Sequence, residues 1–214
     1  MSFEKDKQNS KEFCSEKSNW LSHKQNALSK KDMSFKGCID KRIKPLVDLI
    51  NSKDNYYSSS SCSGRILLIK LAKEKIKADS EWLFISHEKV NASDILSALK
   101  ELPKEEVWFK MEPIILHICC KTVNDAAEVV DKANKVGLKH SGINSLRKKI
   151  VVEIYGNERI ETIIANHKKL LVDETYLKSL AEIANKKLEL THRKIEQLHN
   201  LFKQMQDSEL YYEA

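Results

Sequence analysis

The stretch from Ser58 to Arg65 holds the densest group of chemically active side chains in the sequence. It consists of four serines followed by Cys-Ser-Gly-Arg. Hydroxyl and backbone N–H groups beside an arginine suit an anionic ligand, because a guanidinium presents a fixed fork of donors to a carboxylate or a phosphate. The glycine lets the backbone approach such a ligand closely. The pattern predicts an anion-binding loop in front of a buried strand at 66–71, and a solvated serine-rich turn is the alternative.

Two histidines lie close to apolar strands and carboxylates. His87 follows the strand expected at 82–85 and precedes Glu88, while His117 lies in the most hydrophobic run of the chain together with Glu112. Histidine exchanges a proton near neutral pH, and a neighbouring carboxylate orients it. Each pair is therefore a candidate general base with its orienting acid. Two structural histidines with satisfied hydrogen bonds are the alternative.

The cysteines and glycines exclude several kinds of site. No C-x-x-C pair exists among the five cysteines, and the adjacent Cys119 and Cys120 would point to opposite faces of a strand, so we expect no metal. A nucleophilic Cys62 activated by histidine ranks below a binding site made of hydroxyls and arginine. The five glycines form neither G-x-G-x-x-G nor G-x-x-x-x-G-K-[ST], which argues against a Rossmann nucleotide site and a P-loop.

Composition indicates a globular protein whose net charge is compatible with a nucleic-acid partner. The chain has 214 residues, 41% of them hydrophobic, and 37 basic against 31 acidic residues give a net charge of +6. No apolar run reaches the length of a membrane span, and the first residues lack a secretory signal. An odd number of cysteines without framework spacing fits a reducing compartment, so we expect a cytoplasmic protein without a membrane partner.

Hydrophobic periodicity alternates between helical and strand-like segments. It predicts helices at 38–52, 94–102, 122–136 and 173–205, and strands at 66–71, 82–85, 107–120, 149–155 and 168–172. Pro45 is expected as an irregularity in the first helix, Ser93 as the cap of the second, and Gly137 as the residue that ends the third. Pro113 requires a bulge or an edge position in the longest strand.

A helix, a Ser-Gly pair and a strand occur twice, at 38–71 and again at 122–155. This repetition predicts two related α/β halves that share one mixed sheet, with both Ser-Gly corners near one cleft. The fold class is α/β or α+β, with a long C-terminal helix and without a Rossmann methyltransferase arrangement. We expect a disordered tail at 1–12, a single catalytic domain at 13–205 and a second tail at 206–214.

Several blocks follow one another in an order that is characteristic of one family. They are Asp32-x-Ser34-x-Lys36-Gly37-x-x-Asp40, Tyr57-x-x-Ser60-Ser61-Cys62-Ser63-Gly64-Arg65, Trp82-Leu83-Phe84-x-Ser86-His87-Glu88, Phe109-Lys110-x-Glu112-Pro113-x-x-Leu116-His117, Ser141-Gly142-Ile143 and Ile183-Ala184-Asn185-x-Lys187, with Arg193 beyond them. Over residues 13 to 203 the series resembles the wybutosine-synthesising methyltransferases, the family of tRNA wybutosine-synthesising protein 3 and its archaeal relatives. The sequence departs from that pattern at Ile154-Tyr155-Gly156, where an Ile-Arg-Ser type of strand end is expected, and at Lys139-His140.

The resemblance implies an S-adenosylmethionine-dependent enzyme with a fold unlike that of the Rossmann methyltransferases. Its relatives methylate N4 of the tricyclic base made from the guanosine 3′ to the anticodon of tRNA(Phe). A tRNA- or RNA-binding module without catalysis is the alternative function, and a helical scaffold built on 173–205 is disfavoured by the polar residues at the strand ends. Oligomeric state is left open by the sequence.

The resemblance also distributes roles among the residues. The general base would be His87 or His117, with Glu88 or Glu112 orienting it. The cofactor-binding residues would be Ser59, Ser60, Ser61, Cys62, Ser63, Gly64, Arg65, Ser141 and Gly142. They would hold the donor's carboxylate and ribose, or a substrate phosphate. The substrate-binding residues would be Lys36, Tyr57, Trp82, Trp108, Lys110, Lys187 and Arg193. Basic residues of the terminal helix and the N-terminal region would contact tRNA phosphates.

Overall fold

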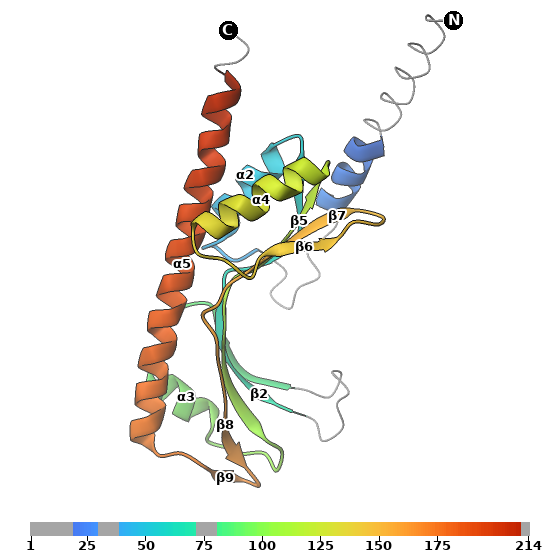
Figure 1. Cartoon of the computed structure of the whole chain (residues 1–214). Coiled ribbons are helices and arrows are strands. Elements are labelled where there is room, and N and C mark those ends of the chain that lie inside the picture. The colour runs from blue at the N-terminus through green and yellow to red at the C-terminus, as the bar shows by residue number, and fades with distance from the viewer. Residues whose placement is uncertain (1–18, 30–38, 72–80, 211–214) are drawn as a thin grey trace, which may run out of the picture.

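Two antiparallel sheets and one long helix dominate the structure, a computed structural model that describes residues 19–29, 39–71 and 81–210 (Figure 1). Sheet A has the order β1-β5-β7-β6, formed by β1 (Tyr56–Cys62), β5 (Ile115–Cys120), β7 (Ile150–Tyr155) and β6 (Gly142–Ser145). Sheet B has the order β3-β2-β4-β8-β9, formed by β3 (Glu81–Ser86), β2 (Arg65–Lys70), β4 (Val107–Glu112), β8 (Ile160–Asn166) and β9 (Lys169–Leu170). The labelled helices are α2 (Lys44–Ser52), α3 (Ala92–Ala98), α4 (Val123–Lys135) and α5 (Glu174–Leu210). Among the described residues, no helix is long and apolar enough to span a membrane.

The chain passes between the two sheets three times, at neighbouring positions. β1 continues into β2 through Ser63 and Gly64, β4 into β5 through Pro113 and Ile114, and β7 into β8 through residues 156–159. The strands on either side of these passages are neighbours in their own sheets. We call these three connections the crossing region. It brings segments that are far apart in the sequence to one place between the sheets.

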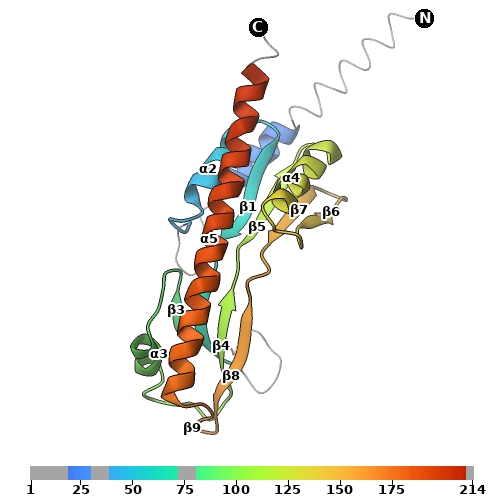
Figure 2. The same cartoon turned by 60° about the vertical axis from the view of Figure 1, so that its left-hand side comes forward.

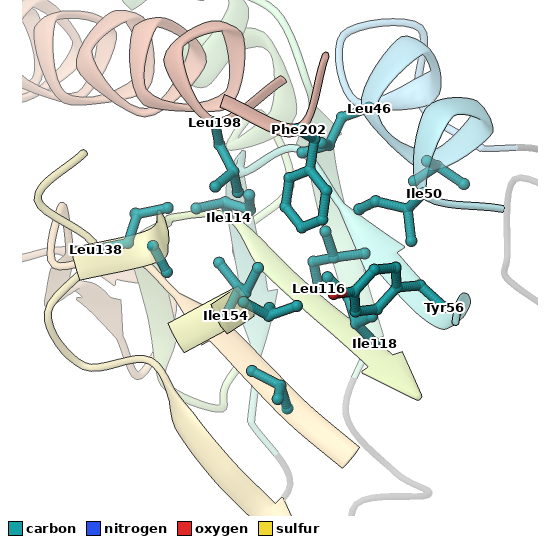
Figure 3. Packing of buried hydrophobic residues seen from close by; sticks show 14 of the residues in the cluster. Leu46, Ile50, Tyr56, Ile114, Leu116, Ile118, Leu138, Ile154, Leu198 and Phe202 are labelled. Carbon is teal, nitrogen blue, oxygen red and sulfur yellow. The ribbon is translucent and has the colours of Figure 1, made fainter. Parts of the chain in front are cut away.

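Helices cover one face of each sheet. In sheet A, alternate side chains such as Leu116, Ile118 and Ile154 pack against α2, α4 and the C-terminal half of α5 (Figure 3). In sheet B, Phe109 and Met111 belong to a second cluster with α3 and the N-terminal half of α5. Because α5 lies along both sheets, it joins the two clusters (Figures 1 and 2). The intervening residues of each strand point to the opposite faces, which we call the open faces.

Local signals explain where the helices begin and end. α2 begins at Lys44 with Pro45 in its first turn, where a missing N–H costs nothing, so the expected start at 38 and the mid-helix irregularity were wrong. Asn91, not Ser93, caps α3. The prediction for α4 is confirmed, with a capping box at its start and Gly137 at φ +81° after its end. α5 runs beyond the predicted end at 205, to Leu210.

The α+β class, the absence of a Rossmann arrangement and the long C-terminal helix are confirmed. The prediction of a single mixed sheet built from two related halves was wrong, because the strands form two antiparallel sheets. Ser63 and Gly64 lie in the crossing region, whereas Ser141 and Gly142 lead into β6 at the outer edge of sheet A, so the two Ser-Gly pairs are not equivalent. The strand predicted at 107–120 is two strands in different sheets, because Pro113 interrupts the ladder. The tail expected at 1–12 lies outside the described residues.

Candidate functional site

The open faces of the two sheets carry eight of the predicted site residues, on either side of the crossing region. Strand alternation places Ser60, Cys62 and His117 on the open face of sheet A, because their neighbours Leu116 and Ile118 point into the core. By the same argument the open face of sheet B carries Arg65, Trp82, Trp108, Lys110 and Glu112. The serine stretch is therefore a strand, β1, and not the loop that its composition predicted.

A row of hydrogen-bonded side chains crosses sheet A. Ser60 pairs with His117 across β1 and β5, and His117 pairs with Glu153 across β5 and β7. The Ser60 Oγ lies 2.6 Å from His117 Nδ1, and His117 Nε2 lies 2.8 Å from Glu153 Oε2. Gly142 stands opposite Glu153 on β6, at the end of the row. Glu153, and not Glu112, is therefore the orienting acid of His117. No local feature of the sequence points to Glu153, because only strand register places it opposite His117.

Arg65 and Glu112 face each other across β2 and β4 at the edge of the crossing region. The Arg65 Nε–H donates to Glu112 Oε2 at 2.7 Å, and the guanidinium carbon lies 5.0 Å from the centroid of the Trp82 ring. A guanidinium has five N–H donors, and this bond uses one of them. The pair therefore holds Arg65 in a fixed position, with donors left over for an anionic ligand.

Lys110 is held in place on the open face of sheet B. Its ammonium lies 2.6 Å from Glu161 Oε1 and 5.7 Å from the centroid of the Trp108 ring. Hydrogen bonding from Lys110, with a further contribution from Arg159, lowers the pKa of Glu161. The Trp108 indole N–H donates to Glu106. Both aromatic rings of this face, Trp82 and Trp108, thus lie against a cation.

His87 is oriented by Asp40 rather than by Glu88. Its Nδ1 lies 3.1 Å from Asp40 Oδ2 and 3.0 Å from the Gly64 carbonyl oxygen, so Nδ1 carries the proton and donates to both acceptors. The buried Asp40 carboxylate also accepts hydrogen bonds from the N–H and hydroxyl groups of Ser63. The Glu88 Oε2 atom instead lies 3.6 Å from Nη2 of Arg42. Asp40 was part of a motif in the sequence but had no assigned role.

Cys62 lies beside this group, with its Sγ 3.9 Å from His87 Nδ1. Burial raises the pKa of the Cys62 thiol to about 11, so the thiol is protonated at neutral pH and a nucleophilic role is disfavoured. Asp40, Cys62 and His87 offer ligand atoms within 4.8 Å of one another. A metal would require the thiolate and a carboxylate that Ser63 already occupies, so we assign no ion to them.

The remaining predicted residues do not join the open faces in the same way. Tyr57 is buried and therefore not exposed for stacking. Its ring centroid lies 5.3 Å from that of Trp20 and 5.6 Å from the Lys149 ammonium. The Ser141 hydroxyl accepts the Tyr155 N–H, and Ser61 pairs with the core residue Leu116. Ser59 is exposed at an irregularity in β1, and Ser63 is fully buried. Lys36 lies outside the described residues.

Lys187 and Arg193 belong to α5, which packs on the faces opposite to the open faces. Arg193 lines a cleft of about 450 Å³ there, together with Arg42, Glu88 and His192. Burial, and after it the positive charge of Arg42, lowers the pKa of His192. The structure therefore separates these two basic residues from the polar groups of the open faces.

Comparisons with known sequences identify one family, and a solved structure shares its fold. The family model described as Methyltransferase TYW3 matches residues 15–204. The Pyrococcus furiosus tRNA(Phe) 7-((3-amino-3-carboxypropyl)-4-demethylwyosine(37)-N(4))-methyltransferase 1 is 37% identical over 166 residues, which are 77% of this chain and 85% of the relative. The mouse tRNA wybutosine-synthesizing protein 3 homolog is 35% identical over 181 residues, covering 83% of this chain and 70% of the relative. The structure of the PH1069 protein from Pyrococcus horikoshii matches with a TM-score of 0.79 and 34% identity, covering 87% of this chain and 97% of that chain. Matched over most of its length, the chain belongs to the Methyltransferase TYW3 family.

Proposed function

We propose that this protein methylates N4 of the tricyclic 7-(3-amino-3-carboxypropyl)-4-demethylwyosine base of tRNA(Phe), with S-adenosylmethionine as the methyl donor. The curated relatives are named for this activity. The observation that carries the proposal is that a methyltransferase-family chain places the pair Ser60–His117 and the pair Arg65–Glu112 on the open faces of its two sheets, on either side of the crossing region. We place this activity in the cytoplasm, because five cysteines without framework spacing fit a reducing compartment.

The donor has a carboxylate, an ammonium group and a sulfonium, and the residues present fit these charges. Arg65 has guanidinium donors beyond the one bound to Glu112, which suit the carboxylate. Glu112 has a second carboxylate oxygen beyond the one bound to Arg65, which suits a cationic centre of the donor. When bound, the donor supplies an electrophilic methyl group. The protein's part is to hold the ring nitrogen about 3–3.5 Å from the methyl carbon and in line with the bond that breaks. Such positioning of the reacting atoms accounts for a large part of the rate acceleration.

The β6–β7 hairpin gives the tRNA backbone a basic surface next to this site. It projects from sheet A away from α5 (Figure 1). Arg147, Lys148 and Lys149 at its tip are all exposed, and the Lys149 ammonium lies 5.6 Å from the centroid of the Tyr57 ring. Phosphate contacts supply much of the affinity of proteins for nucleic acids, because they release condensed counterions. When the target base lies against the open faces, the hairpin would thus bind the adjacent phosphates of the tRNA.

Charge reversal at the hairpin is expected to weaken tRNA binding. In the Arg147→Glu, Lys148→Glu double variant the dissociation constant for tRNA(Phe) rises at low salt. The slope of log Kd against log salt falls by about 1.4–1.8, because two phosphate contacts are lost. Fluorescence anisotropy over a series of salt concentrations measures both quantities. The matched comparison is Lys187→Glu, Arg193→Glu on α5. If that variant lost the salt dependence and the hairpin variant kept it, the tRNA would lie on the α5 side instead.

The function is tested by methyl transfer from labelled S-adenosylmethionine to tRNA(Phe) that carries the demethylated tricyclic base. We expect one methyl group per tRNA, and a nucleoside heavier by one methylene on mass spectrometry. The same tRNA with an unmodified guanosine at that position should take up no label. Binding of tRNA without transfer, and without calorimetric binding of S-adenosylmethionine, would instead identify an RNA-binding module.

A further inference from the structure

We propose that Ser60, His117 and Glu153 form the proton relay of the methylation. In this relay Ser60 touches the substrate, and Glu153 is a positioning residue for His117. This inference rests on the proposed function and specifies how the ring nitrogen loses its proton. It assigns a role to Glu153 and a catalytic role, rather than a binding role, to Ser60.

The hydrogen bonds of the row determine which nitrogen of His117 carries the proton. An ionised carboxylate only accepts, so the 2.8 Å contact with Glu153 requires a proton on His117 Nε2. In the neutral ring the other nitrogen is then an acceptor. The 2.6 Å contact therefore has the Ser60 hydroxyl donating to His117 Nδ1. Ser60 is thereby left with lone pairs for the N–H of a substrate.

Exposure gives the row a direction. Ser60 is exposed on β1, the edge strand of sheet A, whereas the side chains of His117 and Glu153 are 23% and 36% exposed. A bulky tricyclic base approaching the open face would meet the serine hydroxyl before the histidine. The ladder fixes all three backbones, since the residues lie directly opposite one another on β1, β5 and β7. Positioning on strands gives the accuracy that proton transfer needs.

The proton and electron count is balanced in one step. A bond forms between N4 and the methyl carbon while the carbon–sulfur bond breaks, and that electron pair goes to sulfur. The N4 proton passes to Ser60 Oγ as the serine proton passes to His117 Nδ1. The Glu153 carboxylate stabilises the resulting imidazolium, which afterwards returns its proton to water. General-base assistance of this kind contributes about 10²–10⁴-fold to the rate.

Among the described residues, three titratable side chains flank this row on its own strands. Cys62 lies two positions from Ser60 on β1, Cys119 two positions from His117 on β5, and Tyr155 two positions from Glu153 on β7. Lys149 lies over Tyr57. The competing base is His87, whose ring donates to the buried Asp40 and to Gly64 at the crossing region. Its neighbour Glu88 turns instead toward Arg42 and the cleft along α5.

Kinetics of Ser60→Ala and Glu153→Gln test the relay, with Glu182→Gln at an exposed position of α5 as a control. We expect kcat to fall by about 10²-fold or more in both relay variants, with KM for tRNA little changed, and wild-type kinetics in the control. In Glu153→Gln the acid limb of the kcat profile should move to lower pH. It moves in that direction because the lost carboxylate no longer favours the protonated imidazole.

Two results would overturn the relay while leaving the proposed function intact. One is full kcat in folded Ser60→Ala. The other is an acid limb that stays in place in Glu153→Gln but moves in Asp40→Asn, which would assign the base to His87. Nitrogen-15 NMR of the resting protein needs no turnover, so it tests the relay even if the wild type transfers no methyl group. We expect the neutral His117 ring to be protonated at Nε2, and protonation at Nδ1 would rule the relay out.

Discussion

Replacing Gly156 with alanine is expected to lower the free energy of unfolding by about 1–3 kcal/mol, the usual cost of an overpacked interior. A Cβ at this position would lie 2.6 Å from the Cβ of Pro113, closer than real Cβ atoms approach one another. Neither segment can move aside easily, because the Gly156 N–H donates to the Ile114 carbonyl oxygen at 3.1 Å. The glycine in the unusual Ile154-Tyr155-Gly156 corner is thus explained by close packing of two passages in the crossing region.

Urea denaturation of Gly156→Ala measures this loss, and Gly142→Ala is its matched control. A Cβ on Gly142 would have no heavy atom within 4 Å, so we expect that variant to unfold at the wild-type midpoint or slightly above it. Both substitutions add one methyl group to a glycine of sheet A or its margin. Equal midpoints for the two variants would mean that the crossing region tolerates a wider separation of its strands.

The Lys194→Met variant is expected to lose about 3–5 kcal/mol of unfolding free energy, because it strands a buried carboxylate. Lys194 Nζ lies 2.5 Å from Glu158 Oε1, and the two side chains are only 13% and 7% exposed. The ammonium also donates to the Gly137 carbonyl oxygen at 3.2 Å. This ion pair ties α5 both to the β7–β8 passage and to the end of α4, so its loss affects the contact between the helix and the crossing region.

Chemical denaturation should separate this buried pair from an exposed one. Lys89→Met breaks an exposed pair with Glu189 and should cost less than about 1 kcal/mol. Adding Glu158→Leu to Lys194→Met should restore much of the lost stability, since no charge is then left unpaired in the interior. A Lys194→Met variant no less stable than Lys89→Met would show that Glu158 finds another partner.

The polar residues of the site could be named from the sequence, but their partners could not. Ser60, Arg65, His117 and Glu112 were singled out by type and by motif. In the structure, Glu112 is hydrogen-bonded to Arg65, and His117 is hydrogen-bonded to Glu153. The second pairing joins residues whose local sequence gives no sign of it, since Glu153 reads only as a polar position in an apolar strand. Strand register, which depends on contacts over long stretches of chain, makes that choice.

The serine stretch illustrates the opposite case, in which local composition misleads. Four consecutive serines favour a loop. They form β1 because Tyr56 packs into the core of sheet A and β5 supplies the hydrogen bonds for the strand. Serine has a weak preference of its own, so tertiary pairing outweighs it.

By itself, the sequence determined the family, the α+β class, the long terminal helix α5 and the strands β2, β3, β7 and β9, because each depends on motif order or on hydrophobic periodicity within one segment. It did not predict β1, β6 or β8, which the structure adds to the two sheets. Only the tertiary structure decided that the chain divides into two antiparallel sheets at Pro113 and that Asp40 orients His87. It likewise placed Lys187 and Arg193 on the side away from the open faces. The physical reason is the same in each case: which strands pair, and in which register, is set by the burial of both helix-covered faces against α5, and that burial is a property of the whole chain.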